Sequence, residues 1–221
     1  MTPIKDRPYL LLTLAVLFWA GNFILGRAFH TEIPPIALAF WRWVGAAILV
    51  TWPALPHLKR DRQALINAWP AVLLLSLLGI AAFNTLAYSG LQYTQAINAF
   101  LLQSMMPVLI VLFSFLIFRE KVTRLQSLGI LVSLCGAVLI TARGDFERLQ
   151  SLSFNRGDLL VFTAIACYAG YSVMLRKRPH AHPLAFIATT FWIGSILLVP
   201  LYLWETFTVA SMELTHSTLL V

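Results

Sequence analysis

The feature that most constrains this chain is a series of apolar blocks, each close to twenty residues long. The first covers residues 8–29, and six more follow at 34–53, 69–91, 96–118, 124–142, 157–175 and 183–204. A helix of about twenty residues rises roughly 30 Å, which is the thickness of the hydrocarbon core of a bilayer. Membrane β-barrels instead show stretches of about ten residues with alternating polarity. The blocks therefore predict an all-α, polytopic helical membrane protein.

Composition agrees with this fold class and excludes an ordinary soluble domain. Hydrophobic residues make up 59% of the chain and charged residues 11%, whereas soluble domains are about 25% charged. The first block resembles a signal peptide, but its apolar part is about twice the usual length, so we expect an uncleaved first helix. Both cysteines, Cys135 and Cys167, fall inside apolar blocks, and we expect small buried side chains rather than a disulfide or a metal site.

The net charge of +7 raises the question of nucleic acid, but the basic residues follow the membrane topology. Basic residues favour short cytoplasmic connections. With the N-terminus inside, the inside segments hold Lys5, Arg7, Lys59, Arg60, Arg62, Arg119, Lys121, Arg124, Arg176, Lys177 and Arg178. This pattern predicts a cytoplasmic N-terminus, cytoplasmic segments at 55–68 and 176–182, and an outer segment at 143–156. We expect the bacterial inner membrane as the location, the lipid bilayer as a partner and no nucleic acid.

The chain also contains an internal repeat at a shift of 149 positions, as between Gly21 and Gly170 (170 − 21 = 149). Other pairs at this shift are Ala20 with Ala169, Arg27 with Arg176, Pro34 with Pro183, Ala39 with Ala188, Trp43 with Trp192 and Gly45 with Gly194. Five blocks precede the second copy, and because five is odd the two copies cross the membrane in opposite directions. Inverted repeats of this kind build many secondary transporters, with the solute site near the midplane.

Four segments resemble a known family: LFWAGNFILGR, AFWRWVGAAILV, FREKVTRLQSLGILVSLCG and GDLLVFTAIACYAGYSVMLRK. They are similar to EamA-type members of the drug/metabolite transporter superfamily, whose ten helices form two five-helix repeats. The resemblance implies a first repeat at 1–143, a periplasmic connection at 144–156 and an incomplete second repeat at 157–221. A complete second repeat would end at roughly residue 290, so we expect a fragment that lacks helices eight to ten, or else a naturally shortened form.

Asn22 is a polar residue in the middle of the first block, where an unpaired amide is unfavourable in lipid. Helical spacing puts Asn22 on one face with Trp19 and Phe23. The repeat turns Tyr168 and Tyr171 toward the same axis. We therefore expect these side chains to line a central cavity for a small solute. The alternative is that Asn22 hydrogen-bonds a neighbouring helix, with the two glycines of its segment permitting close packing.

Three further polar residues, Arg42, Asn84 and Gln103, share a depth with Asn22, about seven or eight residues and roughly 10–12 Å inside the predicted outer boundary. An arginine at this depth is a candidate for function. We expect Arg42 to bond to Asn84, to Gln103 or to free carbonyls, and its role stays open between anchoring, solute contact and snorkelling to the interface. The candidate solute-binding residues are Trp19, Asn22, Phe23, Arg42, Asn84, Tyr88, Gln103, Tyr168 and Tyr171.

Acidic residues are missing from the middle of every predicted span, and the five histidines lie in or beside loops. A carboxylate proton relay is therefore not expected, and downhill export is the simpler mechanism. Asp158, in the sequence NRGD, is expected to begin the sixth helix as part of a cap. Pro107, in the middle of the fourth block, is expected to bend its helix, either as a gating hinge or as a static kink.

Three functions were compared on these residues. An intramembrane protease needs a nucleophile with a partner base in the membrane, and no such pair is visible, so we expect no enzyme, no metal and no cofactor. A scaffold or lipid-handling protein is the second option. The function favoured by the sequence is export of small metabolites by alternating access, with aromatic or other zwitterionic amino acids first and purines or other metabolites as alternatives. A polar-lined cavity separates a carrier from a solid scaffold, whereas the oligomeric state cannot be predicted from these residues.

Overall fold

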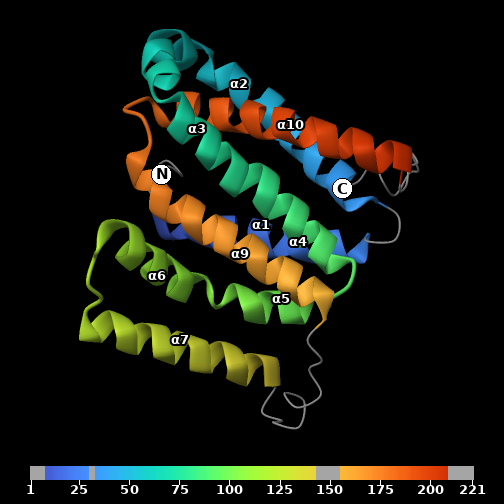
Figure 1. Ribbon diagram of the computed structural model, residues 1–221, viewed down its shortest axis with the longest axis vertical. Helices are drawn as coiled ribbons and strands as arrows, with labels where there is room; N and C mark the ends of the chain where they lie inside the picture. Colours follow the sequence, from blue (N-terminus) through green and yellow to red (C-terminus); the bar gives the residue numbers. More distant parts are fainter. Residues whose placement is uncertain (1–7, 30–32, 143–154, 209–221) are drawn as a thin grey trace.

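The computed structural model describes residues 8–29, 33–142 and 155–208, and this part of the chain is helical without any strand (Figure 1). The elements in chain order are α1 (Pro8–Ala28), α2 (Pro35–Asn67), α3 (Trp69–Ser76), the π-helix η2 (Leu77–Ala82), α4 (Phe83–Leu91), α5 (Ala96–Gln103), α6 (Met106–Phe118), α7 (Arg124–Ala142), α9 (Arg156–Met174), the short 3₁₀ turn η3 (Leu175–Lys177) and α10 (Pro183–Thr208). The all-α prediction is confirmed.

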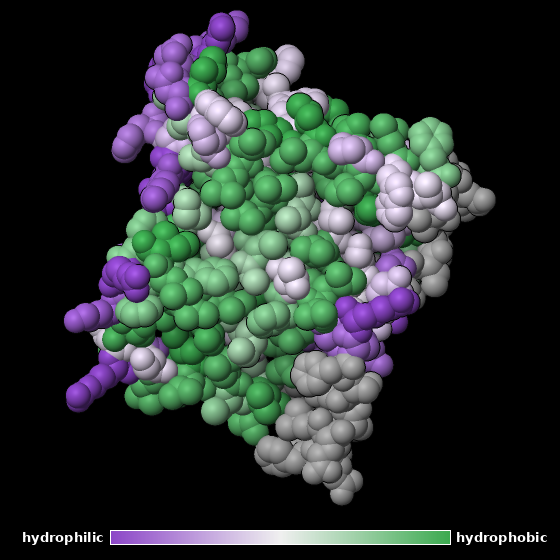
Figure 2. Space-filling model, in the orientation of Figure 1, coloured by the Kyte–Doolittle hydropathy of each residue, from purple (hydrophilic) through white to green (hydrophobic). Residues whose placement is uncertain are grey.

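Six stretches of the described chain are long and apolar enough to cross a bilayer: Tyr9–Ala28, Pro35–Asn67, Trp69–Leu91, Ala96–Phe118, Arg156–Lys177 and Pro183–Thr208. The seventh predicted span forms α7, whose apolar stretch, Arg124–Leu139, is shorter. Figure 2 shows apolar side chains over the middle of the bundle and hydrophilic ones gathered at the edges where the helices end. The chain is therefore a multi-pass membrane protein.

Local signals set several helix boundaries. Proline occupies the first turn of α2, α3 and α6, where its missing N–H is not needed. Asn155 caps α9: its side chain accepts from the backbone N–H of Asp158, and the Asp158 side chain accepts from the backbone N–H of Asn155. The predicted cap at NRGD is confirmed. Arg119 ends α6 in a left-handed conformation (φ 58°).

Helix α2 is longer than predicted. The segment 55–68 was expected to be a loop, but the helix continues through Pro53 and Pro56 to Asn67, for 33 residues. At 1.5 Å per residue this is about 50 Å, which exceeds the roughly 30 Å hydrocarbon core. The end of α2 that carries Lys59, Arg60 and Arg62 therefore extends beyond the bilayer as helix rather than as loop.

Two of the predicted spans are not uniform α-helices. The third contains η2 between α3 and α4, and the fourth breaks at Ser104 and Met105 between α5 and α6. Pro107 lies in the first turn of α6, directly after this break. The expected distortion is therefore present as an interruption of the helix, and the choice between a hinge and a static kink stays open.

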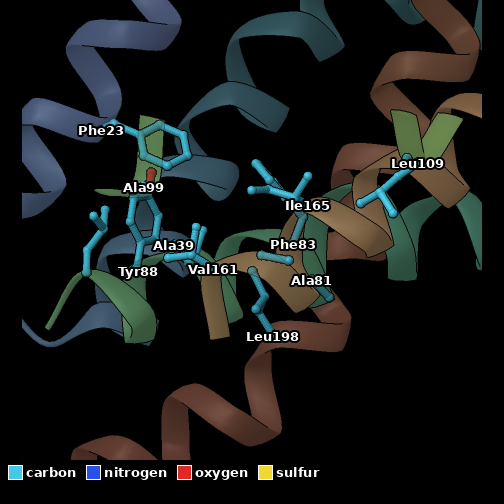
Figure 3. Close-up of a cluster of buried hydrophobic side chains, with 14 residues drawn as sticks. Phe23, Ala39, Ala81, Phe83, Tyr88, Ala99, Leu109, Val161, Ile165 and Leu198 are labelled. Atoms are coloured by element: carbon cyan, nitrogen blue, oxygen red, sulfur yellow. The ribbon is translucent and has the colours of Figure 1, made fainter. Parts of the chain in front are cut away.

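The core lies where α4 and α9 pack against each other, with α2, α5, α6 and α10 around them. Phe83, Val161, Ile165 and Leu198 come together there (Figure 3). Helix α7 lies at one edge of the bundle and packs mainly against α5 (Figure 1). Cys135 on α7 is exposed for this reason, whereas Cys167 on α9 is half-buried. The expectation of two buried cysteines was therefore wrong for Cys135.

The most extensive helix pair of the described chain is α2 with α10. The two helices are antiparallel, because the start of α2 contacts the end of α10 and Thr51 of α2 contacts Trp192 of α10. Opposite directions are what an inverted repeat requires of these two helices. The repeat itself and the boundaries 1–143, 144–156 and 157–221 stay predictions, and most of the 144–156 connection lies outside the described residues.

Candidate functional site

A cavity of about 430 Å³ opens between α1, α2, the η2–α4 segment, α9 and α10. A volume of this size is in the range of small-molecule sites, roughly 300–1,000 Å³. Its walls are formed by Phe18, Trp19, Asn22, Arg42, Trp43, Gly79, Ile80, Phe83, Asn84, Tyr168, Tyr171, Ile187, Thr190 and Phe191. This open space is therefore lined by residues from both predicted repeats.

Aromatic residues make up half of the wall. The ring of Tyr168 lies 5.1 Å from that of Trp19 and 4.8 Å from that of Phe83, measured between centroids. On another side Trp43 meets Phe191 edge-on at 4.6 Å. Edge-on and tilted contacts of this kind hold aromatic side chains in fixed positions. The cavity thus presents several rigid ring faces to an occupant.

Arg42 is hydrogen-bonded to the side-chain amide of Asn84, which is itself hydrogen-bonded to the backbone. The Nη2 group of Arg42 donates to Asn84 Oδ1 at 2.5 Å, and Asn84 Nδ2 donates to the carbonyl of Ile80 at 2.8 Å. Asn84 is 2% exposed. Asn84 is one of the expected partners of Arg42, and this contact is confirmed. The side-chain oxygen and nitrogen of Asn84 both form hydrogen bonds within the protein.

The π-helix η2 supplies the Ile80 carbonyl and brings the helices close together. A side chain at Gly79 would come within 2.6 Å of the ring of Tyr171, so only glycine allows this approach. Segments of π-helix are often found at functional sites because they shift the side chains that follow. Here the residues that follow include Phe83 and Asn84 of the cavity wall.

Asn22 combines the two roles left open by the sequence. Its Oδ1 accepts from the hydroxyl of Tyr88 at 2.6 Å, which joins α1 to α4, while Asn22 also lines the cavity. Gly26 permits this contact, because a side chain there would lie 3.0 Å from the ring of Tyr88. Gly21 has nothing within 4 Å of such a side chain, so the close packing predicted for both glycines holds for Gly26 alone.

Six of the nine candidate residues line the cavity, namely Trp19, Asn22, Arg42, Asn84, Tyr168 and Tyr171. The other three lie behind the wall. Phe23 packs on Phe100 at 5.7 Å, Tyr88 is 3% exposed and supports Asn22, and Gln103 ends α5 with its Oε1 buried and unpaired. Two residues at the same depth in the membrane can lie on different faces of their helices. The shared depth of Gln103 and Asn22 therefore did not place Gln103 in the cavity wall.

Sequence reasoning missed eight residues of the wall: Phe18, Trp43, Gly79, Ile80, Phe83, Ile187, Thr190 and Phe191. Trp43 had a signal, since it is next to Arg42 and matches Trp192 in the repeat. The others are apolar or small residues in apolar helices, and nothing in their pattern distinguishes a cavity wall from lipid contact.

Glu205 directly follows the last predicted span, 183–204, and was therefore expected outside the membrane, but α10 continues to Thr208 and buries this side chain to 3% exposure. Its two oxygens accept from the backbone N–H groups of Ile36, at 3.0 Å, and Ala37, at 2.7 Å. A carboxylate at a helix N-terminus is stabilised by the free N–H groups and by the helix dipole. Glu205 of α10 therefore caps α2.

Asp158 lies at the same end of the bundle as Glu205 and is 4% exposed (Figure 1). Besides its part in the α9 cap, it accepts from the hydroxyl of Thr94 at 2.5 Å. Thr94 belongs to the connection between α4 and α5. The two described acidic side chains at this end are thus buried and bound by uncharged donors.

At the opposite end the two described acidic side chains, Asp61 and Glu120, are paired with arginines. Asp61 contacts Arg60 at 2.8 Å and also accepts from the backbone N–H of His182, just before α10, at 2.6 Å. The rings of His182 and His57 stack with centroids 3.5 Å apart. This group connects the end of α2 to the start of α10.

Glu120 connects the α6–α7 loop to the end of α9. It accepts from Arg176 at 2.5 Å and from the hydroxyl of Ser114 at 2.7 Å. The Arg176 guanidinium, and after it the Ser114 hydroxyl, hold the pKa of Glu120 below its ordinary value. Half of the Glu120 side chain is exposed, so water and salt compete for this pair.

Comparison with known proteins identifies relatives over most of the chain. The profile of the EamA-like transporter family matches residues 6–142. The chain is 29% identical over 193 residues to the uncharacterized transporter YyaM of Bacillus subtilis, covering 86% of this chain and 63% of the relative. It is 30% identical over 210 residues to an uncharacterized transporter of Archaeoglobus fulgidus, covering 92% of this chain and 70% of the relative.

A riboflavin transporter of Brucella anthropi is 29% identical over 159 residues, covering 72% of this chain and 50% of the relative. The chain thus matches between half and about two thirds of the length of these three relatives. Their names indicate transport rather than enzymatic activity.

Proposed function

Because this chain belongs to the EamA-like transporter family, we propose that it exports small aromatic metabolites from the bacterial cell, aromatic amino acids first, by alternating access around the cavity. The N-terminus is cytoplasmic in this proposal and the protein resides in the inner membrane. The solute occupies the space between α1, α2, the η2–α4 segment, α9 and α10.

One observation carries the proposal: the bundle contains a cavity of about 430 Å³ whose wall combines ring faces with a few fixed polar groups. A scaffold needs no such space, and its helices would be expected to pack without it. A carrier needs apolar contact area together with directed hydrogen bonds, and Trp19, Tyr168 and Arg42 offer both.

A planar heteroaromatic solute is a second candidate. The riboflavin transporter named above supports it, together with the ring faces of Trp19, Phe83 and Tyr168. Purines, which the sequence left open, belong to the same class of flat ring systems. Amino acids and flat heteroaromatics differ in charge, so competition experiments separate them.

The test is counterflow of radiolabelled phenylalanine, tryptophan, adenine and riboflavin in proteoliposomes that contain the full-length protein. We expect at least one of these solutes to exchange and Asn22→Ala to weaken its uptake several-fold. Ser133→Ala is the matched control, since Ser133 is exposed on α7, away from the cavity. Uptake no faster than in protein-free liposomes for all four solutes would contradict the proposal.

Tyr88→Phe separates the two roles of Asn22, because it removes only the hydrogen bond between α1 and α4. If Asn22 contacts the solute, Asn22→Ala lowers uptake more than Tyr88→Phe does. Equal losses would leave Asn22 as a connection between helices.

A further inference from the structure

Several polar groups around the cavity already form hydrogen bonds within the protein. The two amide oxygens are already occupied: Asn84 Oδ1 accepts from Arg42, and Asn22 Oδ1 accepts from Tyr88. The Thr190 hydroxyl donates to the carbonyl of Ile187 at 2.9 Å. These bonds use one lone pair of each amide oxygen and the proton of the Thr190 hydroxyl.

Two buried donors belong to residues of the wall. The Nε of Arg42 and the indole Nε1 of its neighbour Trp43 are buried and have no hydrogen-bond partner in the described chain. A buried donor without a partner loses about 1–3 kcal/mol relative to hydration. Such donors are expected where a ligand supplies the missing acceptor.

The charge of the wall is unbalanced. Arg42 is its cation, and no Asp or Glu lines the cavity among the residues that the structure describes. The buried carboxylates of the described bundle, Glu205 and Asp158, are bound to other groups at one end. A cation in a space of low dielectric constant is stabilised by an anion and destabilised by a second cation.

Asn84 holds the Arg42 guanidinium in a fixed position in which it can bind an anion. Because Asn84 is fixed by the Ile80 carbonyl, it holds one edge of the guanidinium, and the Arg42 Cζ lies 4.8 Å from the centroid of the Trp43 ring. A guanidinium held in this way recognises a carboxylate with little loss of conformational entropy.

We propose that the cavity recognises its solute by a carboxylate, bound through Arg42 and Trp43, with an aromatic ring against Trp19 and Tyr168, and that it does not recognise an ammonium group. The occupant is thus an aromatic carboxylate, and an amino acid binds by its acid end alone. This inference rests on the proposed function, since it assumes that the transported solute occupies this cavity.

The experiment uses three probes with the same phenyl ring and two-carbon chain: 3-phenylpropanoate, with the acid alone; phenylalanine, with both groups; and phenethylamine, with the amine alone. Affinities are measured by isothermal titration calorimetry on the full-length protein in lipid nanodiscs at neutral pH. We expect 3-phenylpropanoate to bind at least as tightly as phenylalanine and phenethylamine to bind at least tenfold more weakly.

Two variants assign the preference to its residues. Arg42→Gln should reduce the tenfold difference between acid and amine to less than twofold. Trp43→Phe keeps a ring and removes only the indole donor, so it should lower the affinity for the acid several-fold while the affinity for the amine is unchanged. Ser133→Ala should match the wild type for all probes. If Arg42→Gln does not fold, Trp43→Phe and the wild-type ranking decide.

Three results would overturn the inference: binding of phenethylamine as tight as that of the acid, binding of phenylalanine more than tenfold tighter than that of 3-phenylpropanoate, or binding of none of the three. Transport of the same probes in proteoliposomes separates this inference from the proposed function. The expected ranking in binding without any uptake contradicts the transport proposal and leaves the recognition intact. Uptake that favours the amine contradicts the recognition of a carboxylate and leaves the transport proposal intact.

Discussion

The four acidic side chains of the described chain lie two at each end of the bundle, and the two ends treat them differently. Glu205 and Asp158, at 3% and 4% exposure, are buried. At the other end the side chains of Asp61 and Glu120 are 12% and 50% exposed and pair with arginines. The first pair is bound by backbone N–H groups and a hydroxyl, and the second by charged groups that water reaches.

Because of this difference, the helices should separate less easily at one end of the bundle than at the other. Opening the Glu205 end uncovers a carboxylate and leaves the first N–H groups of α2 without partners, unless water enters at once. Opening the Asp61 end separates ion pairs whose arginines, Arg60 and Arg176, are more than half exposed, and water replaces the lost contacts at little cost. The described helices are therefore held more firmly at the Glu205 end, which the topology prediction assigns to the periplasm.

The largest effect is expected for Glu205→Ala. The change removes two charge-assisted hydrogen bonds to Ile36 and Ala37, so the free energy of unfolding should fall by about 3 kcal/mol. Glu205→Gln keeps one oxygen and should lose about half of that amount. Chemical denaturation of the full-length protein in detergent micelles measures both, and a loss no larger than that of Asp61→Ala would break the comparison.

Asp158→Ala should have the second largest effect, about 1–2 kcal/mol, because both the α9 cap and the bond to Thr94 are lost. Thr94→Val removes the hydroxyl bond alone and should account for about 1 kcal/mol. The same denaturation experiment applies. If Thr94→Val is neutral, the buried end depends on the cap and not on the contact between α9 and the α4–α5 connection.

Asp61→Asn should lower the stability by less than Thr94→Val does. The amide oxygen still accepts from the His182 N–H, and what is lost is the attraction to Arg60, whose side chain is 68% exposed. Arg60→Gln is the matched control and should be near neutral. If Asp61→Asn lowers the stability as much as Glu205→Ala does, this end is held as firmly as the other.

Replacing Glu120 should have the smallest effect on stability, and this effect should depend on pH. Its pKa is lowered in the folded state by Arg176 and Ser114. The pair therefore contributes fully above the unfolded pKa of about 4.3, and its contribution disappears as the pH falls through the folded pKa. Melting curves between about pH 6 and about pH 3 should show a smaller acid loss for Glu120→Gln than for the wild type. Identical slopes for the two proteins would contradict the prediction.

The helices and their order could be predicted because apolar length alone identifies a membrane span. What could not be predicted was the continuation of α2 beyond Pro53, since a run containing Lys59 and Asp61 is equally compatible with a loop. The π-helix η2 was also invisible, because its residues, LLGIAA, are ordinary for an apolar helix. Such departures depend on the neighbours of a helix rather than on its own sequence.

The same limit applies to the cavity. Asn84 was one of the three kinds of partner expected for Arg42, since a buried cation must have a partner and few polar groups were within reach, and it is the one observed. Phe23 was placed on the cavity face because helical spacing groups it with Asn22, whereas in the structure it turns toward Phe100. Glu205 was expected outside the membrane because the end of its helix was set four residues too early (208 − 204). Whether the cavity residues bind solute stays a prediction.

Helix α2 has the properties of a lever. Glu205 holds it at Ile36, Arg42 lies six positions further on and Asp61 twenty-five, which correspond to about 9 Å and about 37 Å along the axis. If the firmly held end is the fulcrum, a shift of the far end moves Arg42 by about a quarter as much (6/25). A shift of several ångströms at the far end of α2, which contacts Trp192 of α10 and His182, would therefore move the guanidinium by about 1 Å.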